Sequence, residues 1–257
     1  MKPLPIKQHA VDQLTAFVYA SRSEMGAAAA ADISTFIKEK LAQQERVRII
    51  FAAAPSQNEV LACLAADRSI PWQRVEAFHM DEYIGLPQAA QQRFGQFLQQ
   101  RLFALVPFYA VHYIQSEQES EIACASYAEL LQRAPIDLVC LGIGENGHLA
   151  FNDPPVADFA DPAAVKTVEL DEACRQQQVN DGCFASLAEV PTHAITLTIP
   201  TLLSAERLFC IVPGASKAEA VRRTLLDDIA TACPSTILRK QKHCTLYLDQ
   251  ASYGELL

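Results

Sequence analysis

Hydrophobic positions along this chain follow two alternating patterns. Short, nearly continuous apolar runs are typical of strands that are buried on both faces. Between these runs, apolar positions recur three and four residues apart, which is typical of helices that bury one face. The predicted strands cover residues 48–53, 75–78, 111–114, 136–141, 194–199, 208–212 and 244–248. The predicted helices cover residues 23–43, a segment around 60–64, and residues 94–106, 119–133 and 216–226.

This alternation of strands and helices predicts parallel pairing with right-handed crossovers. We therefore expect an α/β fold in which a doubly wound, mostly parallel sheet carries helices on both faces. No repeat or low-complexity tract interrupts the chain, so we expect one α/β domain over residues 1–257. In such sheets, ligands bind outside the carboxyl ends of the strands. The candidate functional residues are therefore those that directly follow each predicted strand.

Composition narrows the classes of function. With 50% hydrophobic and 20% charged residues, the chain can bury a sizeable core, which excludes intrinsic disorder. A formal net charge of −9 argues against a nucleic-acid partner, because an acidic surface repels phosphate backbones. The N-terminal residues contain no apolar core of signal-peptide length, no apolar run is long enough to span a membrane, and the eight cysteines form no C-x-x-C pair. We expect a cytoplasmic protein with buried thiols, no membrane partner and no metal. The sequence does not decide whether the protein forms a homo-oligomer.

Two strand ends carry features of an anion site. The first predicted strand is followed by a turn with Ser56 and Gln57 that opens a helix, and free amides at a helix N-terminus attract anions. Simple capping of that helix by Ser56 is the alternative interpretation. Lys217 follows strand 208–212 in the first helical turn, where its charge opposes the helix dipole. An anionic ligand would explain that position, and a surface lysine without a role is the alternative.

A pair of acids follows the strand at 75–78. Asp81 and Glu82 are adjacent, and burying two carboxylates is costly unless they are used or paired. A carboxylate at this position is a natural candidate for a general base. The alternative is a solvated loop in which Asp81 caps a helix. His79 lies close by, but its spacing to these acids matches no common metal motif.

A glycine-rich loop follows the strand at 136–141. Its glycines, among them Gly144, permit close approach of a ligand to the backbone. Their spacing does not fit the dinucleotide motif G-x-G-x-x-G, so we expect no nicotinamide cofactor. His148 stands in this loop and can shuttle protons near neutral pH, with Asn146 and Asp153 placed to orient its ring. A purely structural histidine is the alternative. Base, shuttle and anion pocket together suit proton abstraction next to a carbonyl or imine, without a cofactor.

Two segments resemble the glucosamine-6-phosphate isomerase/deaminase family, which is related to the 6-phosphogluconolactonases. Residues 78–87 read FHMDEYIGLP and resemble that family's F-x-M-D-E-Y-x-G-L-P segment. Residues 141–154 read LGIGENGHLAFNDP and resemble its G-x-G-x-[DN]-G-H-x-A-F-N-E-P segment. The later sequence GASK at 214–217 also agrees. The resemblance spans nearly the whole chain and implies a Rossmann-like fold.

The resemblance also implies an activity and residue roles. Family members convert glucosamine 6-phosphate and water to fructose 6-phosphate and ammonia, without a cofactor. By this resemblance, Asp81 takes the C2 proton and returns it at C1 through an enolamine, while His148 opens the sugar ring. Asp153 stands where the family has a supporting glutamate, Asn146 stands at a position often held by aspartate, and Lys217 binds the phosphate.

This chain departs from the family pattern at its anion site. The usual Ser/Thr-Gly-Gly-Thr-Pro turn is replaced by a glycine-free turn, although Ser56 and the helix amides remain. A phosphate-binding arginine expected later in the chain aligns with Gln178. Arg175, three residues earlier, and Arg93, which follows the G-L-P turn, are the candidates for the missing charge.

These departures keep other functions open. An isomerase/deaminase of another amino sugar, galactosamine 6-phosphate or an unphosphorylated one, is one alternative. Lactone hydrolysis as in the 6-phosphogluconolactonases is another, although their motif usually continues Thr-Ala-Ser after Gly-His, where this chain has Leu149 and Ala150. A non-catalytic sugar-phosphate sensor on the same fold is the third, although a sensor has no need of a base poised for proton transfer. In each case the expected partner is a small molecule, foremost an amino-sugar phosphate.

Overall fold

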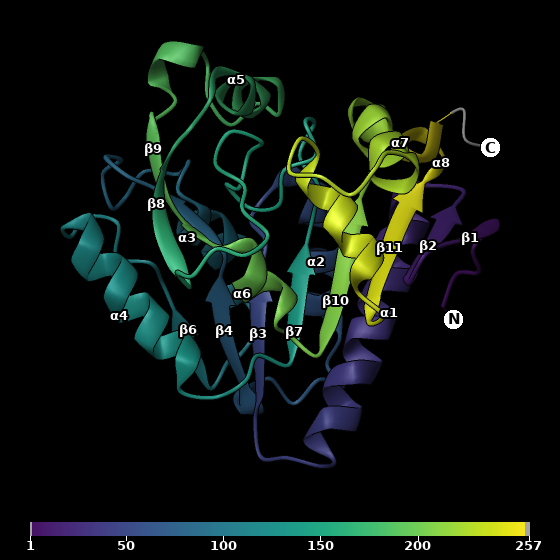
Figure 1. Cartoon of the computed structure of the whole chain (residues 1–257). Helices are drawn as coiled ribbons and strands as arrows, with labels where there is room; N and C mark the ends of the chain where they lie inside the picture. The colour runs from purple at the N-terminus through teal and green to yellow at the C-terminus, as the bar shows by residue number, and fades with distance from the viewer. Residues whose placement is uncertain (1, 255–257) are drawn as a thin grey trace.

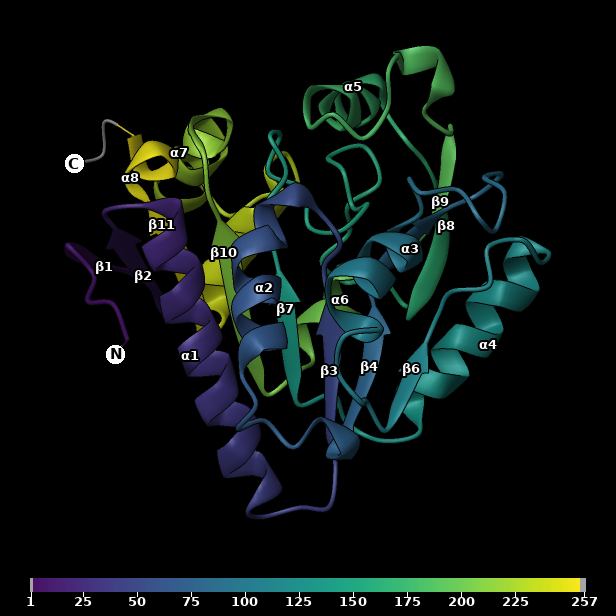
Figure 2. The same ribbon diagram turned by 180° about the vertical axis from the view of Figure 1, so that it is seen from behind.

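The computed structural model describes residues 2–254 and contains a large central sheet (Figures 1 and 2). Its strands are β1 (Lys7–Val11), β2 (Leu14–Tyr19), β3 (Val47–Phe51), β4 (Val75–His79), β6 (Ala110–His112), β7 (Leu138–Leu141), β10 (Arg207–Val212) and β11 (Cys244–Asp249). Their order in the sheet is β1-β2-β11-β10-β7-β3-β4-β6. The pair β1–β2 is antiparallel and the other neighbours are parallel.

Helices cover both faces of this sheet. One face carries α1 (Arg22–Leu41), α2 (Asn58–Ala66), α3 (Phe94–Leu98) and a π-helical turn at Gln99–Phe103 (Figure 2). The other carries α4 (Ser120–Gln132), α6 (Ile199–Leu203) and the 3₁₀ helix η6 (Pro234–Lys240) (Figure 1). Every residue of β3 and β7 is buried, which explains their continuous apolar runs. The predicted doubly wound, mostly parallel α/β fold is confirmed.

A second, three-stranded sheet departs from the prediction. It consists of β5 (Asp81–Tyr83), β9 (His193–Leu197) and β8 (Val165–Glu169), paired antiparallel with β9 in the middle. The predicted strand at 194–199 therefore exists, but its assignment to the main sheet is wrong. The chain leaves the main sheet just after β4, where the Leu197 amide donates to the Met80 carbonyl at 2.8 Å. This transfer between sheets brings Asp81 to their junction.

Some elements have no counterpart in the sequence prediction. The β1–β2 hairpin at the sheet edge, β5, β8 and α5 (Glu172–Asn180) were not predicted, and the helix expected over 94–106 is divided between α3 and the π-helical turn. In Figure 1, α5 lies above the carboxyl ends of the strands, as do α7 (Ala218–Leu226) and α8 (Gln250–Tyr253). The eight cysteines are free thiols. Among residues 2–254, no helix has both the length and the apolar character that crossing a membrane requires.

Candidate active site

A cavity of about 150 Å³ opens at the carboxyl ends of the central strands. It brings together several residues that the sequence predicts for the site, namely Ser56, Asp81, Gly144, His148 and Lys217. These residues follow four different strands, and the topology of the fold gathers them at one edge of the sheet, as the strand-end rule predicts. Arg22 from α1 and Gln177, Gln178 and Asp181 from α5 and its C-terminus also line the cavity.

Asp81 is a buried carboxyl at the junction of the two sheets. It is the first residue of β5, it pairs with Thr196 of β9, and only 6% of it is exposed. Burial raises its pKa well above the usual range, and the nearby charges of Glu82 and Asp153 add to the increase. The ionised form of such a group is a stronger base than a solvated carboxylate. It therefore suits the removal of a proton from carbon.

Glu82 serves a different purpose from its neighbour. Its carboxylate accepts hydrogen bonds at 3.0 Å each from the amides of Tyr83, Phe94 and Gly95. Glu82 thus satisfies free amides at the start of α3. Burial raises its pKa, although these amides and the charge of Arg93 oppose the increase. Of the two adjacent acids, only Asp81 lines the cavity.

His148 is held by a hydrogen-bonded support behind it. Its Nδ1 lies 2.9 Å from both Asn146 Oδ1 and Asp153 Oδ1, and Asn146 Nδ2 donates to Asp153 Oδ1 at 2.8 Å. Since both neighbours of Nδ1 are acceptors, Nδ1 carries a proton and Nε2 remains available for proton transfer. Burial alone would raise the pKa of Asp153, but the charge of His148 and hydrogen bonds from His148 and Asn146 lower it. Asn146 and Asp153 do not line the cavity; they act on it through His148.

The glycines of the loop leave room for this arrangement. A Cβ atom on Gly144 would lie 2.1 Å from His148 Cε1, so the imidazole packs directly on the Gly144 backbone. Gly147 has a φ of +89°, and a Cβ atom there would lie 2.5 Å from Cys233 Sγ. Both positions therefore require glycine for the present position of His148.

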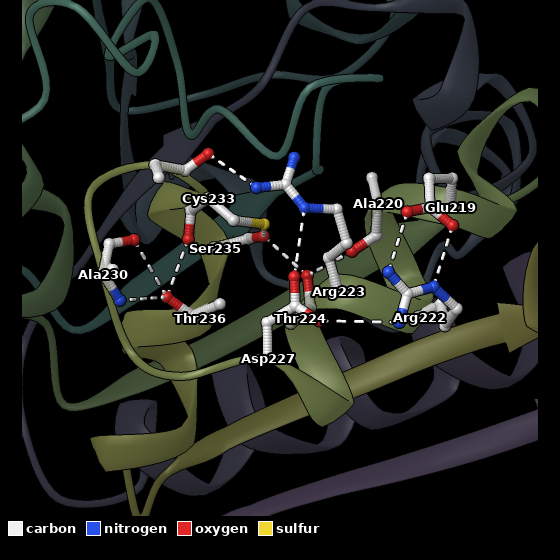
Figure 3. A network of polar contacts seen from close by, with 11 residues as sticks. Glu219, Ala220, Arg222, Arg223, Thr224, Asp227, Ala230, Cys233, Ser235 and Thr236 are labelled. Carbon is white, nitrogen blue, oxygen red and sulfur yellow. Dashed lines mark hydrogen bonds and ion pairs between the residues drawn. The ribbon is translucent and has the colours of Figure 1, made fainter.

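A polar network beside the histidine loop includes a contact to Gly147, and its members on α7 and η6 are drawn in Figure 3. The Ser235 amide donates to the Gly147 carbonyl at 2.8 Å, and Ser235 Oγ lies 2.5 Å from Thr224 Oγ1. Thr236 Oγ1 donates to the Cys233 carbonyl at 2.7 Å, which fixes the turn that begins η6. Figure 3 shows how these side chains connect α7 to η6. The network therefore supports the histidine loop through residues that do not line the cavity.

Ser56 and Lys217, both predicted for an anion site, line the same cavity, and one detail of the prediction needs correction. Helix α2 begins at Asn58, after the 3₁₀ turn η1 (Pro55–Gln57), and its cap position is held by Gln57 without a side-chain bond. Capping by Ser56 is therefore wrong. Ser56 lines the cavity instead and accepts a hydrogen bond from Gln57 Nε2 at 3.1 Å. Gln57 itself is buried behind the cavity, where its Nε2 also donates to the Ile211 carbonyl at 3.2 Å.

Lys217 is a buried lysine that faces the cavity. It ends the 3₁₀ turn η5 (Ala215–Lys217) and is only 5% exposed. No side chain among the described residues pairs with its ammonium group within ion-pair distance. Burial lowers its pKa, and the charges of Asp181 and Glu145 oppose the decrease. An unpaired buried cation is costly, and an anionic ligand would reduce that cost.

Arg93 and Arg175 are not brought to this cavity, so their prediction as substitutes for the missing arginine is wrong. The Arg93 guanidinium contacts the carboxylates of Glu82 and Glu117 at 3.4 and 3.3 Å and lines a separate cavity of about 180 Å³. The Arg175 guanidinium donates to the carbonyls of Leu187 and Val190 at 2.7 and 2.9 Å, which ties α5 to the following loop. Both guanidinium groups are occupied by structural partners.

Sequence reasoning missed Arg22 and residues of α5. Arg22 lies more than thirty residues before the turn that contains Ser56, and no predicted strand precedes it. The strand-end rule therefore could not identify it. Gln177 gave no signal, although its Oε1 accepts from the Glu145 amide at 2.8 Å. Gln178, where the resemblance implies an arginine, does line the cavity.

One group of side chains has the composition of a metal site. Ligand atoms of His148, Asp153 and Cys174 lie within 4.8 Å of one another, and all three residues are buried. The His148–Asp153 contact of 2.9 Å is that of a hydrogen bond between the two. In this arrangement the Cys174 thiol, whose pKa is raised strongly by burial, packs against the Asp153 carboxylate.

Comparison with known proteins agrees with the geometry. The family described as glucosamine-6-phosphate isomerases/6-phosphogluconolactonase matches residues 20–247. A glucosamine-6-phosphate deaminase of Bacillus cereus (strain G9842) is 37% identical over 180 residues, which is 69% of this chain and 66% of that protein. The alignment thus spans just under two thirds of that relative's length.

Solved structures share the fold over most of the chain. The structure of a monomeric glucosamine-6-phosphate deaminase has a TM-score of 0.85 and 26% identity, covering 93% of this chain and 98% of that one. The structure of a 6-phosphogluconolactonase from Thermotoga maritima has a TM-score of 0.76 and 19% identity, covering 92% of this chain and 99% of that one. At this identity the similarity establishes a shared fold and nothing more. On its sequence, fold and cavity, this chain belongs to the glucosamine-6-phosphate isomerase/6-phosphogluconolactonase family.

Proposed function

We propose that this protein is an amino-sugar-phosphate isomerase/deaminase, with glucosamine 6-phosphate as the first candidate substrate. The observation that carries the proposal is the meeting of three groups in one cavity: Asp81, His148 and Lys217. They supply a base, a proton shuttle and a cation. The relatives named as glucosamine-6-phosphate deaminases support this choice of substrate.

The proposed reaction uses each group in turn. His148 moves a proton from the C1 hydroxyl to the ring oxygen, which opens the sugar to its aldehyde. Asp81 removes the C2 proton, giving an enolamine, and returns that proton to C1. The product is an imine at C2; water adds to this carbon and ammonia leaves, which yields the ketose phosphate. No step requires an oxidant, a reductant or a cofactor.

The electrostatics of the cavity fit these steps. The raised pKa of Asp81 brings its basicity closer to that of a weakly acidic carbon, and the ionised Asp153 stabilises a charged His148 during ring opening. Lys217 lines the same cavity, where a phosphate would replace the hydration that its ammonium group has lost.

Ammonia release tests the proposal. Purified protein is assayed with glucosamine 6-phosphate, galactosamine 6-phosphate and free glucosamine, while acid release is followed with 6-phosphogluconolactone. We expect turnover of one amino-sugar phosphate, and Asp81→Asn to lower kcat by about 10²- to 10⁴-fold, the usual contribution of a positioned base. Asp228→Asn, at an exposed carboxylate outside the cavity, is the matched control and should retain full activity. Turnover of the lactone alone, or an active Asp81→Asn variant, would exclude the proposed reaction.

A further inference from the structure

The anion side of the cavity lacks two features that the family resemblance leads us to expect. Its turn contains no glycine, and Gln178 stands where the resemblance implies a phosphate-binding arginine. Among the described residues that line the cavity, the lysine and arginine side chains are those of Lys217 and Arg22. A second positive charge is therefore present, but it comes from α1 and not from α5.

Close packing of two helices brings Arg22 to this position. Arg22 is the first residue of α1, directly after the cap Ser21, whose Oγ accepts from the Glu24 amide at 3.2 Å. Helices α1 and α2 approach so closely that a Cβ atom on Gly26 would lie 2.4 Å from Glu59 Cβ. Because Gly26 is one turn along from Arg22, this approach places the start of α1 against the turn η1.

Two contacts fix the Arg22 guanidinium at that turn. Arg22 Nε lies 2.7 Å from Glu59 Oε1, and Arg22 Nη2 donates to the Pro55 carbonyl. Pro55 immediately precedes Ser56, which lines the same cavity. A guanidinium has further N–H groups beyond those used in these contacts. They remain to bind a ligand next to the Ser56 hydroxyl.

The chemistry of this corner points to an oxyanion. Arginine binds phosphate through paired N–H groups in a fixed geometry and carries a positive charge. The glutamine at position 178 has no charge to offer. The Arg22 side chain is 38% exposed, so its charge is inexpensive to keep and available to a ligand that enters from solvent.

We propose that Arg22 is a substrate-binding residue that holds the phosphate group together with Lys217 and Ser56, and that it replaces the family's arginine. This inference rests on the proposed function. If Arg22 binds the phosphate, specificity for a phosphorylated sugar depends on the packing of α1 against α2. Arg22 takes no part in proton transfer.

The test compares three variants. Arg22→Gln removes the charge, Arg22→Lys keeps the charge without the paired geometry, and Glu59→Gln breaks the ion pair between the helices but leaves Arg22 charged. For the amino-sugar phosphate that the wild type turns over, we expect Arg22→Gln to raise KM by about 10- to 100-fold, the loss of a charged hydrogen bond, with a smaller effect on kcat. The KM of Arg22→Lys should lie between those of the wild type and Arg22→Gln. Glu59→Gln should raise KM less than Arg22→Gln does, because the charge of Arg22 and its contact with the Pro55 carbonyl remain.

Phosphate binding provides a second readout that does not require turnover. Inorganic phosphate should compete with substrate and raise the Tm of the wild type and Glu59→Gln, and Arg22→Gln should lose most of both effects. If the wild type releases no ammonia from any amino-sugar phosphate, the proposed function fails while the Tm measurement still tests Arg22. An unchanged KM in Arg22→Gln, an equal defect in Glu59→Gln, or no phosphate effect on wild-type Tm would each overturn the inference.

Discussion

Single residues of the same type have different uses in this site because their surroundings differ. Asp81 and Glu82 are adjacent acids. The Glu82 carboxylate accepts hydrogen bonds from backbone amides at the start of α3, whereas Asp81 is buried close to other carboxyl groups. The strand-end rule located both acids from the sequence. It did not separate their roles, because that separation depends on where α3 begins.

Gly144 offers a prediction at this scale. Substitution Gly144→Ala would place a Cβ atom 2.1 Å from the His148 ring, so the imidazole has to move away from its present position. A displacement of this kind costs about 100-fold in rate. We expect kcat for ammonia release to fall by roughly that factor, while KM changes less because the Lys217 side of the cavity is untouched.

Urea unfolding of the Gly144→Ala variant is the control, since a folded protein should show a cooperative transition with an unchanged slope. Wild-type kcat in a folded Gly144→Ala protein would mean that the histidine does not act from the position described.

At the scale of helices and strands, the sequence predicts what burial dictates. The runs at 48–53 and 136–141 are buried on both faces, and so their apolar residues are consecutive and easily recognised. The three-residue β5 is too short for any periodicity and begins with two acids. The β1–β2 hairpin lies at an edge of the sheet, with alternating half-exposed positions in β1 that mix polar and apolar residues.

The site was predictable to the same extent. Asp81, His148 and Lys217 follow strands whose carboxyl ends meet at one edge, so the topology alone brings them together. The place of Arg22 depends on how closely α1 packs on α2. That distance follows from a glycine-to-glutamate contact across two helices, which no local pattern encodes.

The contact between α7 and η6 yields a prediction for these elements. Thr224 is fully buried, donates to the Ala220 carbonyl at 2.7 Å and lies 2.5 Å from Ser235 Oγ. Thr224→Val keeps the shape but leaves the Ser235 hydroxyl without this partner. We expect the free energy of unfolding to fall by about 1–3 kcal/mol. We also expect kcat to fall by about tenfold, because Ser235 supports the loop that carries His148.

A surface change on the same helix is the comparison for this variant. Arg222 contacts Glu219 in solvent (Figure 3), so Arg222→Gln should leave both quantities unchanged. Urea denaturation and steady-state ammonia release measure them. Should Thr224→Val match the wild type in both, the network would have no part in holding the loop.

For the molecule as a whole, a buried histidine sets part of the pH dependence of stability. His79 is completely buried, and its Nε2 accepts a hydrogen bond from the Ile114 amide at 2.9 Å. Burial lowers its pKa from 6.5 to about 3, and the charge of Arg93 contributes in the same direction. In the unfolded chain the imidazole binds a proton below about pH 6.5, whereas in the folded protein it stays neutral down to about pH 3.

The sign of the effect follows from this difference in proton binding. As the pH falls through 6.5, the unfolded state takes up a proton that the folded state does not, so His79 lowers the stability progressively until about pH 3. Asp81 and Glu82 act in the opposite direction, because their raised pKa values favour the folded state as the pH falls. The contribution of His79 is therefore visible only as a difference between the wild type and a variant that cannot titrate.

His79→Gln provides that difference, because its Oε1 can accept the Ile114 amide in place of Nε2 and carries no titrating group. At neutral pH we expect the variant to be less stable, since glutamine fills the buried aromatic site poorly. Below the ordinary histidine pKa, the wild type should lose stability relative to the variant by about 1.4 kcal/mol per pH unit, the value for one proton. Urea unfolding of both proteins over a series of pH values measures this gap. A gap that stays constant with pH would mean that His79 binds its proton in the folded protein as readily as in the unfolded chain.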